Sequence, residues 1–254
     1  MKYFRYISIT FILHFLLFGC QNEETPEVLD EHENSELMDV LNGDLITPDG
    51  VLARAYTFLL NSTNFRAVQD YYYDVDGNVI LTVALNPDLD TLGASIYYYD
   101  PLGRLETKKS YQYEEGGYSW TGDLKSTFEA EGTIETVHVI PSDSSPPKFR
   151  LRNVFYERGL LQVTDYVIDE ERYEYSYEGI RPIRMNHMFG ENIYMEYMYR
   201  YNDQGQLEAK ETDIHNGGDA FQYFYDEAGI LEEERENSPQ WGYSILSRRM
   251  YEYY

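Results

Sequence analysis

Few side chains in this sequence have the types and spacing that catalysis requires. The sequence contains no Cys-x-x-Cys, no His-Glu-x-x-His, no glycine-rich phosphate loop and no nucleophile elbow. Its histidines are scattered, at His14, His32, His138, His187 and His215. We interpret His138, in the strand-like run 134–140, as a surface or rim residue rather than a base or a metal ligand. The sequence therefore predicts a protein that is not an enzyme and has no metal site and no cofactor.

The acidic residues invite comparison with two kinds of site, a calcium loop and the carboxylate pair of a glycoside hydrolase. Residues 74–78 read Asp-Val-Asp-Gly-Asn, but an EF-hand loop needs glycine at its sixth position and glutamate at its twelfth, where this chain has Leu85. Among 45 acidic residues some pair will lie at the separation of a glycoside hydrolase, and the sequence does not distinguish such a pair. Most of these acids alternate with the aromatic residues and are expected to face water, whereas a catalytic acid needs a partly buried site.

Two tryptophans have the types for a binding platform. Trp120 and Trp241, with Tyr118 and Tyr243 beside them, are candidates for stacking on sugar rings. The alternative, which we favour, is that these rings pack in the core or cover a sheet end, as most aromatic residues at alternating positions do.

One short phrase is repeated along the chain: a tyrosine that ends an aromatic run, an acidic turn, a glycine and an aliphatic residue. Asp or Asn at the first position of a type I turn bonds the backbone two residues on, and glycine at the fourth accepts a left-handed conformation. This combination is a common tight hairpin connection. The phrase begins at Tyr73, Tyr99, Tyr201 and Tyr225, with looser copies at Tyr156 and Tyr177. The predicted turn residues are Asp74, Gly77, Asp100, Gly103, Gly159, Gly179, Gly205, Asp226 and Gly229.

The residues between the turns alternate as antiparallel strands do. Tyr173, Tyr175 and Tyr177 alternate with polar residues, and so do Tyr197, Tyr199 and Tyr201. The predicted fold is all-β: an antiparallel meander of repeated β-hairpins that forms a large twisted or curled sheet, with no sizeable helical domain. We expect residues 251–254, a phrase without its turn, to be the final strand that closes the sheet.

The beginning of the chain has the pattern of a secretory signal. Lys2 and Arg5 precede an apolar run over 7–18, which is too short to span a bilayer. The following Gly19-Cys20 resembles the lipobox of bacterial lipoproteins, which implies cleavage and acylation of Cys20, the single cysteine of the chain. The alternative is an ordinary signal peptide with an unpaired thiol.

Composition divides the chain into three parts. We expect a signal peptide at 1–19, an acidic flexible tether at 20–49, and a hairpin-repeat β domain at 50–254 with an exposed proline- and serine-rich loop at about 140–148. Removing residues 1–19 takes away two basic residues, so 18 basic residues face 45 acidic ones and the formal charge becomes −27. Such a charge disfavours nucleic acid as a partner. The acidic cluster after Cys20 resembles the export signal of surface lipoproteins, so we expect an outer-membrane lipoprotein of the cell envelope, exposed at the surface.

The phrases resemble the YD repeats of the RHS family, matched as Tyr-Asp-x-x-Gly-x-Leu at Tyr73, Tyr99, Tyr201 and Tyr225. That resemblance implies a β-strip of hairpins that winds into a shell. A rival resemblance is to the MORN-variant repeats of antitoxin-like proteins, which share Tyr-Tyr-x-x-x-Gly-x-Leu.

Three functions follow as expectations. The first is a membrane-anchored, non-enzymatic scaffold that binds a protein or glycan partner through its β sheet. The second is a surface lipoprotein that binds or processes carbohydrate. The third is an immunity-type lipoprotein that neutralises a toxin.

Overall fold

The computed structural model describes one compact unit of the chain, within Glu31–Tyr254. The described residues are 37–41, 45, 50–59, 65–114, 117–129, 133–143, 145–156, 159–166, 170–212, 218–238 and 244–253. The signal peptide, Cys20, His215 and Trp241 lie outside these residues, as does most of the predicted tether.

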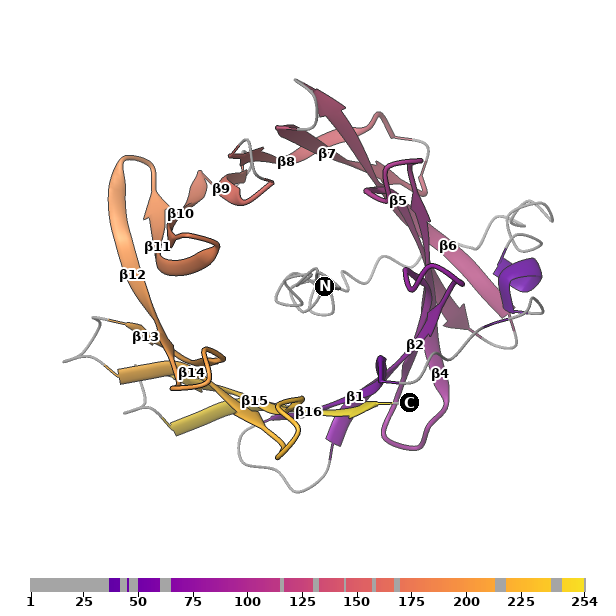
Figure 1. Cartoon of the computed structure of the whole chain (residues 1–254). Helices are drawn as coiled ribbons and strands as arrows, with labels where there is room; N and C mark the ends of the chain where they lie inside the picture. The colour runs from indigo at the N-terminus through magenta and orange to yellow at the C-terminus, as the bar shows by residue number, and fades with distance from the viewer. Residues whose placement is uncertain are drawn as a thin grey trace. The chain divides into compact units, whose positions relative to one another are not determined.

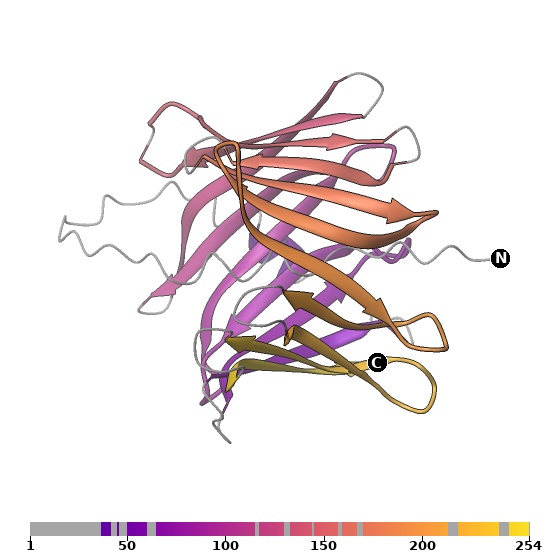
Figure 2. The same cartoon turned by 90° about the vertical axis from the view of Figure 1, so that its left-hand side faces the viewer.

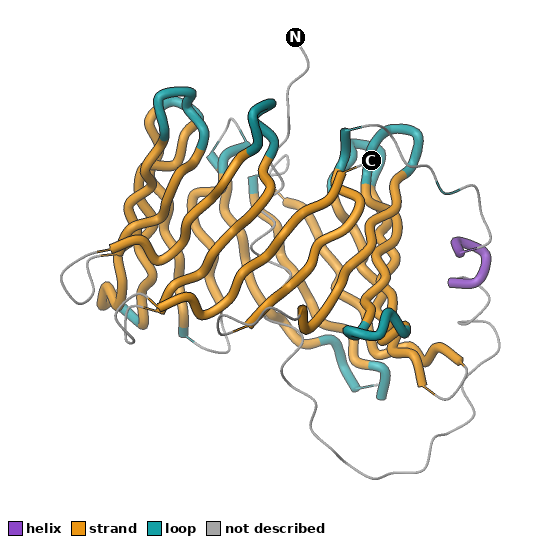
Figure 3. The backbone as a smooth tube through the Cα atoms, turned by 90° about the horizontal axis from the view of Figure 1, so that it is seen from below, coloured by secondary structure: helices purple, strands orange, loops and turns teal. Residues whose placement is uncertain are grey.

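Sixteen antiparallel strands, each hydrogen-bonded to its neighbours in sequence, form a closed barrel (Figure 1). The strands are β1 (Leu52–Leu59), β2 (Phe65–Tyr73), β3 (Val79–Leu85), β4 (Thr91–Tyr99), β5 (Leu105–Glu114), β6 (Gly117–Glu129), β7 (Ile134–Pro141), β8 (Lys148–Phe155), β9 (Leu161–Tyr166), β10 (Glu171–Glu178), β11 (Arg181–Phe189), β12 (Asn192–Tyr201), β13 (Leu207–Thr212), β14 (Gly218–Tyr225), β15 (Leu231–Ser238) and β16 (Ser244–Tyr253). The strands are tilted, and the turns lie at two opposite ends (Figures 2 and 3).

The prediction of a large twisted or curled sheet is wrong, because the first and last strands pair and close the sheet into a barrel. β1 pairs with β2 on one side and with β16 on the other, in a register that runs from Leu52↔Tyr253 to Leu59↔Ser247. A closed ring leaves no strand with unpaired backbone groups, which an open sheet of sixteen strands would expose at two edges. The repeated phrases specify how neighbouring strands pair. The expectation of a closing strand at the last phrase is confirmed for residues 251–253, which pair with β1 as part of β16.

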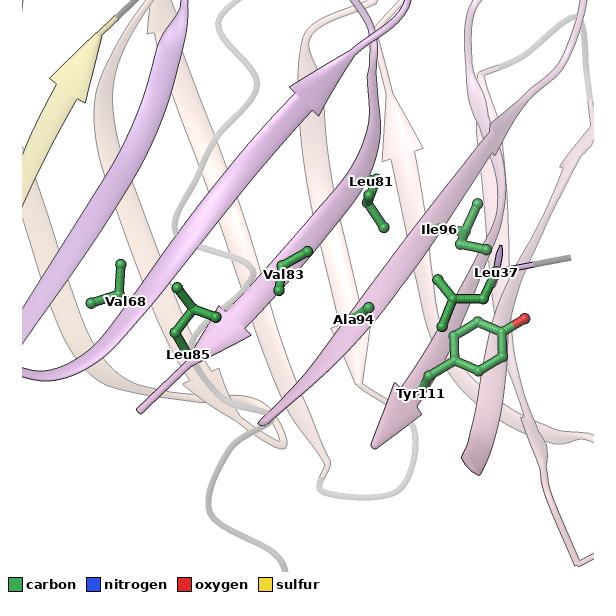
Figure 4. Packing of buried hydrophobic residues seen from close by; sticks show 8 residues of the cluster. All are labelled: Leu37, Val68, Leu81, Val83, Leu85, Ala94, Ile96 and Tyr111. Atoms are coloured by element: carbon green, nitrogen blue, oxygen red, sulfur yellow. The ribbon is translucent and has the colours of Figure 1, made fainter. Parts of the chain in front are cut away.

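A short helix at residues 37–41 identifies the outer side of the wall. The helix lies outside the ring of strands in both Figure 1 and Figure 3. Leu37, which is 0% exposed, belongs to the same packed cluster as Leu81, Ile96 and Tyr111 (Figure 4). These positions therefore face outward, and the alternate positions of the same strands, such as Thr82, face inward. This part of the predicted tether is packed on the barrel.

The phrase turns lie together at one end of the barrel, which we call the tip rim. In the copy at Asp100, the Gly103 N–H donates to the Asp100 carbonyl at 2.8 Å, and Gly103 has a φ of +72°. The Asp100 carboxylate accepts from the N–H groups of Leu102 and Arg104 at 2.9 and 3.0 Å. These are the hydrogen bonds of a type I turn followed by a left-handed glycine. The glycines with positive φ in phrase turns are Gly77, Gly103, Gly159, Gly179, Gly205 and Gly229.

Two turns differ in detail from the sequence analysis. Glu178 pairs directly with Arg181, so Gly179 is the first residue of a two-residue hairpin loop rather than the last residue of a type I turn. The predicted loop at 140–148 is also shorter, since Pro141 is the last residue of β7 and Lys148 begins β8.

The phrase tyrosines form a ladder of hydrogen bonds near the tip rim. Tyr201, at the end of β12, donates its hydroxyl proton to the carbonyl of Pro182 in β11 at 2.8 Å. Each such bond fixes the end of one strand to the beginning of its neighbour, and the ring covers the inner wall between them. The same bond joins Tyr73 to Leu52, Tyr99 to Val79, Tyr177 to Leu161, Tyr225 to Leu207 and Tyr253 to Leu231.

Between β6 and β9 a chain of polar side chains crosses the inner wall. The Glu135 carboxylate accepts from Ser126 at 2.7 Å and from Asn153 at 2.8 Å. Thr164 in turn donates to Asn153 at 2.7 Å. These side chains satisfy one another's hydrogen-bonding groups. They thereby join four strands at a place where the Tyr-Asp phrases are absent or loose.

Candidate ligand-binding site

A pocket of about 430 Å³ lies at the end of the barrel opposite the tip rim, which we call the pocket rim. It is formed by the second half of β9, the starts of β8 and β10 and the turns that follow β9 and β11. Its lining side chains include two arginines, three acidic residues and two aromatic rings. They are Phe149, Arg152, Asp165, Tyr166, Glu170, Glu171 and Arg172, with Gly190 at the edge. A volume of this size falls within the usual range for small-molecule sites.

The two arginines of the pocket differ in their partners. Arg172 lies 3.0 Å from Glu174 and 3.5 Å from Asp165. Arg152 stands directly opposite Asp165 in the β8–β9 register and is exposed. Within the part of the chain that the structure describes, it has no hydrogen bond, ion pair or ring contact. Its planar fork of N–H donors is therefore available to a ligand.

The backbone beside the pocket is strained. Glu170 has a φ of +55°, a left-handed conformation that is unfavourable for a residue with a Cβ atom. Its carbonyl accepts from the Gly190 N–H at 3.0 Å, which ties the β9–β10 turn to the β11–β12 turn. Strained backbone of this kind concentrates at binding and catalytic sites, because the surrounding structure must hold it in place.

A row of aromatic rings begins at the pocket residue Tyr166 and crosses four adjacent strands, β9 to β12. Tyr166 meets Tyr173 edge-to-face at 5.8 Å, and Tyr173 stacks on His187 at 4.4 Å. His187 meets Tyr194 edge-to-face at 5.4 Å. The row joins the pocket to the exposed end of β12, so a ligand in the pocket has an aromatic surface beside it.

The middle of this row contains titratable groups whose pKa values are shifted. Burial lowers the pKa of His187, and the Glu171 carboxylate 3.7 Å away opposes that shift only in part. Burial and the same carboxylate raise the pKa of Tyr173, which donates to Glu171 at 3.1 Å. At neutral pH the histidine is neutral and the tyrosine keeps its proton, so Glu171 contributes the negative charge.

An apolar ledge continues from the pocket along the β11–β12 hairpin. Phe189, Ile193 and Tyr194 are 56%, 57% and 59% exposed. Exposed apolar side chains that are grouped beside a pocket mark a contact surface more often than the same side chains scattered singly.

The outer wall from β9 to β16 carries ion pairs. Arg184 lies 3.6 Å from Glu196, and Arg235 lies 2.5 Å from Glu233. Arg200 lies 3.0 Å from Glu208 and also contacts Glu211 and Asp219. An arginine that faces lipid at the middle of a bilayer costs about 2–4 kcal/mol. These arginines would carry that cost if this part of the wall lay at the middle of a bilayer.

Of the residues that sequence reasoning singled out, His138 borders the pocket and Trp120 does not. Trp120 is half-buried on the outer wall against the Leu81 cluster, and its Nε1 donates to Asp123 at 2.7 Å. It is on β6 and does not line the pocket, while Trp241 lies outside the described residues, so the predicted tryptophan platform stays a prediction. His138 meets Phe149, a pocket residue, edge-to-face at 5.7 Å.

Residues 74–78, compared above with a calcium loop, form a turn. The Asp74 carboxylate accepts from the N–H groups of Asp76 and Asn78 at 2.9 and 2.8 Å. Within the described ranges, no three His, Cys, Asp or Glu side chains are grouped to hold a metal ion.

Sequence reasoning missed the pocket, because its residues come from three strands and two turns whose arrangement is not encoded locally. The positive φ of Glu170 has no sequence signal, since glycine or asparagine is the usual residue in that conformation. A signal that was present is the exposed Phe-Gly-Glu-Asn turn at 189–192, with apolar residues on both sides.

A buried lysine on the inner wall, Lys210, is a second unusual group. Lys210 is 8% exposed, and its Nζ lies 5.1–5.8 Å from the ring centres of Tyr199, Phe221 and Tyr223. Burial lowers its pKa, and Glu234 partly opposes the shift. Because the three rings already surround the ammonium group, we interpret Lys210 as a packing residue stabilised by cation–π contacts.

No helix among the described residues is long and apolar enough to cross a membrane.

Comparisons with known proteins give fold likeness at low similarity only. No family model matches the chain, and no curated protein matches it. The crystal structure of TcdB2-TccC3 is similar with a TM-score of 0.38 and 13% identity over 74% of this chain, which spans only 11% of that one. A porin-like protein from Bacteroides uniformis ATCC 8492 is similar with a TM-score of 0.41 and 10% identity, over 82% of this chain and 100% of that one. These scores are too low to support an argument about function.

Proposed function

We propose that this protein is a lipid-anchored, non-enzymatic binding scaffold of the bacterial cell envelope, which holds its ligand at the pocket rim. The observation that carries the proposal is the grouping there of a pocket, an arginine without a partner among the described residues, strained backbone and an exposed apolar ledge. Elsewhere the phrase tyrosines and turn acids are engaged in hydrogen bonds that hold the barrel together. The pocket rim is therefore the part of the described structure to which we assign ligand binding.

The anchor in this proposal is Cys20. An outer wall that carries several arginine ion pairs suits a barrel that is attached to a membrane by acyl chains rather than embedded in one. The helix at 37–41 is packed on the barrel, so the segment between the anchor and the barrel is shorter than the tether expected from composition. The likeness of the phrases to YD repeats fits a scaffold role, in which the hairpins build a rigid wall and the ligand contacts come from other residues.

The ledge provides the test of the binding site. We would measure binding of the full chain to a mixed panel of oligosaccharides and peptides, and compare it with the double variant Phe189→Ser, Tyr194→Ser. The expected result is at least a tenfold loss of affinity for the ligand that the unaltered protein binds, because apolar contact at the ledge is removed. The matched control is Val75→Ser, Ile180→Ser, which alters the exposed apolar residues of the tip rim, 81% and 75% exposed. Equal losses in both variants, or no binding by the unaltered protein, would contradict the proposal.

The anchor has its own test. Cells that express the protein incorporate a labelled fatty acid into it, and Cys20→Ala is expected to abolish the label and release the protein from the membrane fraction. Unchanged membrane association of the Cys20→Ala protein would contradict lipid anchoring.

A further inference from the structure

We propose that the ligand at the pocket rim is an oligosaccharide that carries carboxylate groups, and that Arg152 binds one of these carboxylates. The proposal rests on the proposed function and adds the chemical class of the ligand. It follows from the donors, acceptors and rings that the pocket places together.

The guanidinium of Arg152 supplies the recognition of a carboxylate. Asp165 stands opposite Arg152 but lies 3.5 Å from Arg172, which is also held by Glu174. The positive charge of Arg172 is thereby neutralised within the protein, whereas no described carboxylate pairs with Arg152. An arginine fork matches the two oxygens of a carboxylate with two parallel hydrogen bonds.

The remaining groups suit the body of a sugar. Phe149 and Tyr166 offer apolar ring surface to the C–H face of a pyranose, and Glu170 and Glu171 offer acceptors to its hydroxyl groups. Tyr194 extends the aromatic surface along the ledge, so a second sugar unit has a ring to contact. A pocket of about 430 Å³ takes a few sugar units and is too small for a folded protein domain.

Charge argues against two other classes of ligand. A nucleic acid or polyphosphate would meet Asp165, Glu170 and Glu171 in the pocket and a chain of formal charge −25 around it, so a dense row of anions is repelled. A basic peptide would place its cations beside Arg152. Carboxylates spaced one per sugar unit carry a lower charge density than phosphates, so this repulsion is weaker while one carboxylate pairs with Arg152.

The experiment compares acidic and neutral forms of the same saccharides. We would titrate the full chain with a panel of uronic-acid oligosaccharides of different linkage, each also in a form with its carboxyl groups reduced to alcohols. The expected result is that at least one acidic oligosaccharide binds at least tenfold more tightly than its reduced form. Arg152→Gln is expected to remove that preference and to leave the thermal midpoint unchanged, because the side chain is exposed and has no hydrogen bond or ion pair to the described residues. Arg184→Gln, at an exposed arginine paired with Glu196 on the outer wall, is the control and is expected to keep the preference.

The outcomes separate this inference from the proposed function. Binding of a peptide or a neutral saccharide that is lost in the ledge variant, with no preference for any acidic form, would overturn the inference and leave the proposed function standing. An acidic preference that survives Arg152→Gln would overturn the role of Arg152. Binding of nothing in the panel at the ledge would overturn both.

Discussion

Single residues in this barrel show how a side chain can conflict with the turn it occupies. The turn at Asn86 has the hydrogen bonds of the phrase turns: its side-chain oxygen accepts from the N–H groups of Asp88 and Asp90, both at 2.9 Å. In place of glycine it has Leu89, whose φ is +67° and whose side chain is 51% exposed. The left-handed conformation costs a residue with a Cβ atom about 1–2 kcal/mol, and little packing offsets that cost here.

Leu89→Gly is therefore expected to stabilise the barrel by about 0.5–1 kcal/mol, because removal of the strain exceeds the added entropy of the unfolded chain. The measurement is the free energy of unfolding in denaturant. Leu102→Gly is the control: Leu102 is an exposed turn residue without a positive φ, so the change should destabilise. Equal destabilisation by both changes would contradict the assignment of strain to Leu89.

His187 gives a dependence on pH. Burial lowers its pKa in the folded barrel below the ordinary value, near 6.5, that it has in the unfolded chain. The unfolded chain therefore binds more protons at mildly acidic pH, and the stability of the barrel falls as the pH falls through about 6.5. His187→Gln is expected to flatten this slope in the thermal midpoint between neutral pH and pH ~5. An unchanged slope in the variant would show that other groups cause it.

At the residue scale the sequence predicted turns better than ligand contacts. Asp100 and Gly103 could be recognised because turn chemistry is local, and four successive residues contain it. Arg152 is available because the carboxylates of Asp165 and Glu174 pair with Arg172 instead. No local pattern in the sequence encodes which arginine these carboxylates choose.

Elements are held to one another by side chains as well as by the backbone ladder. The hydroxyl bond from Tyr201 to the Pro182 carbonyl joins the end of β12 to the start of β11. The ring also lies 5.5 Å below the Arg181 guanidinium. The first contact depends on the hydroxyl group and the second does not.

Tyr201→Phe is expected to destabilise the barrel by about 1 kcal/mol, the usual net value of one such hydrogen bond, while the cation–π contact is kept. Tyr194→Phe is the control, since that side chain is exposed on the ledge and is expected to change stability by less than about 0.5 kcal/mol. The free energy of unfolding in denaturant measures both changes. A loss in Tyr194→Phe as large as that in Tyr201→Phe would contradict the ladder.

The alternation of tyrosines with polar residues predicted the strands, because a wall with two different faces needs a period of two. The packing of residues 37–41 on the outer wall was not predicted. Acidic composition around the helix suggested a free tether, but Leu37, Val40 and Leu41 provide an apolar face for the wall at Leu81 and Ile96.

The whole molecule depends on the meeting of its first and last strands. Closure creates an inner wall for the phrase tyrosines and an outer wall for the ion pairs, and it brings β8 to β12 to the geometry that forms the pocket. The sequence predicted a sheet too large to stay flat, and it contained no signal to choose between curling, spiralling and closing. That choice depends on the sum of small twists over sixteen strands, which no single phrase contains.

Native-state amide hydrogen exchange along β1 tests closure most directly. In the closed barrel, β1 is hydrogen-bonded to β2 and to β16, so the amides of residues 54–58 are expected to exchange as slowly as those of a central strand such as β4. In an open strip β1 would be an edge strand, and every second amide would face water. Slow exchange at each of these residues is the result that the closed barrel predicts, and alternating fast exchange along β1 and β16 would contradict it.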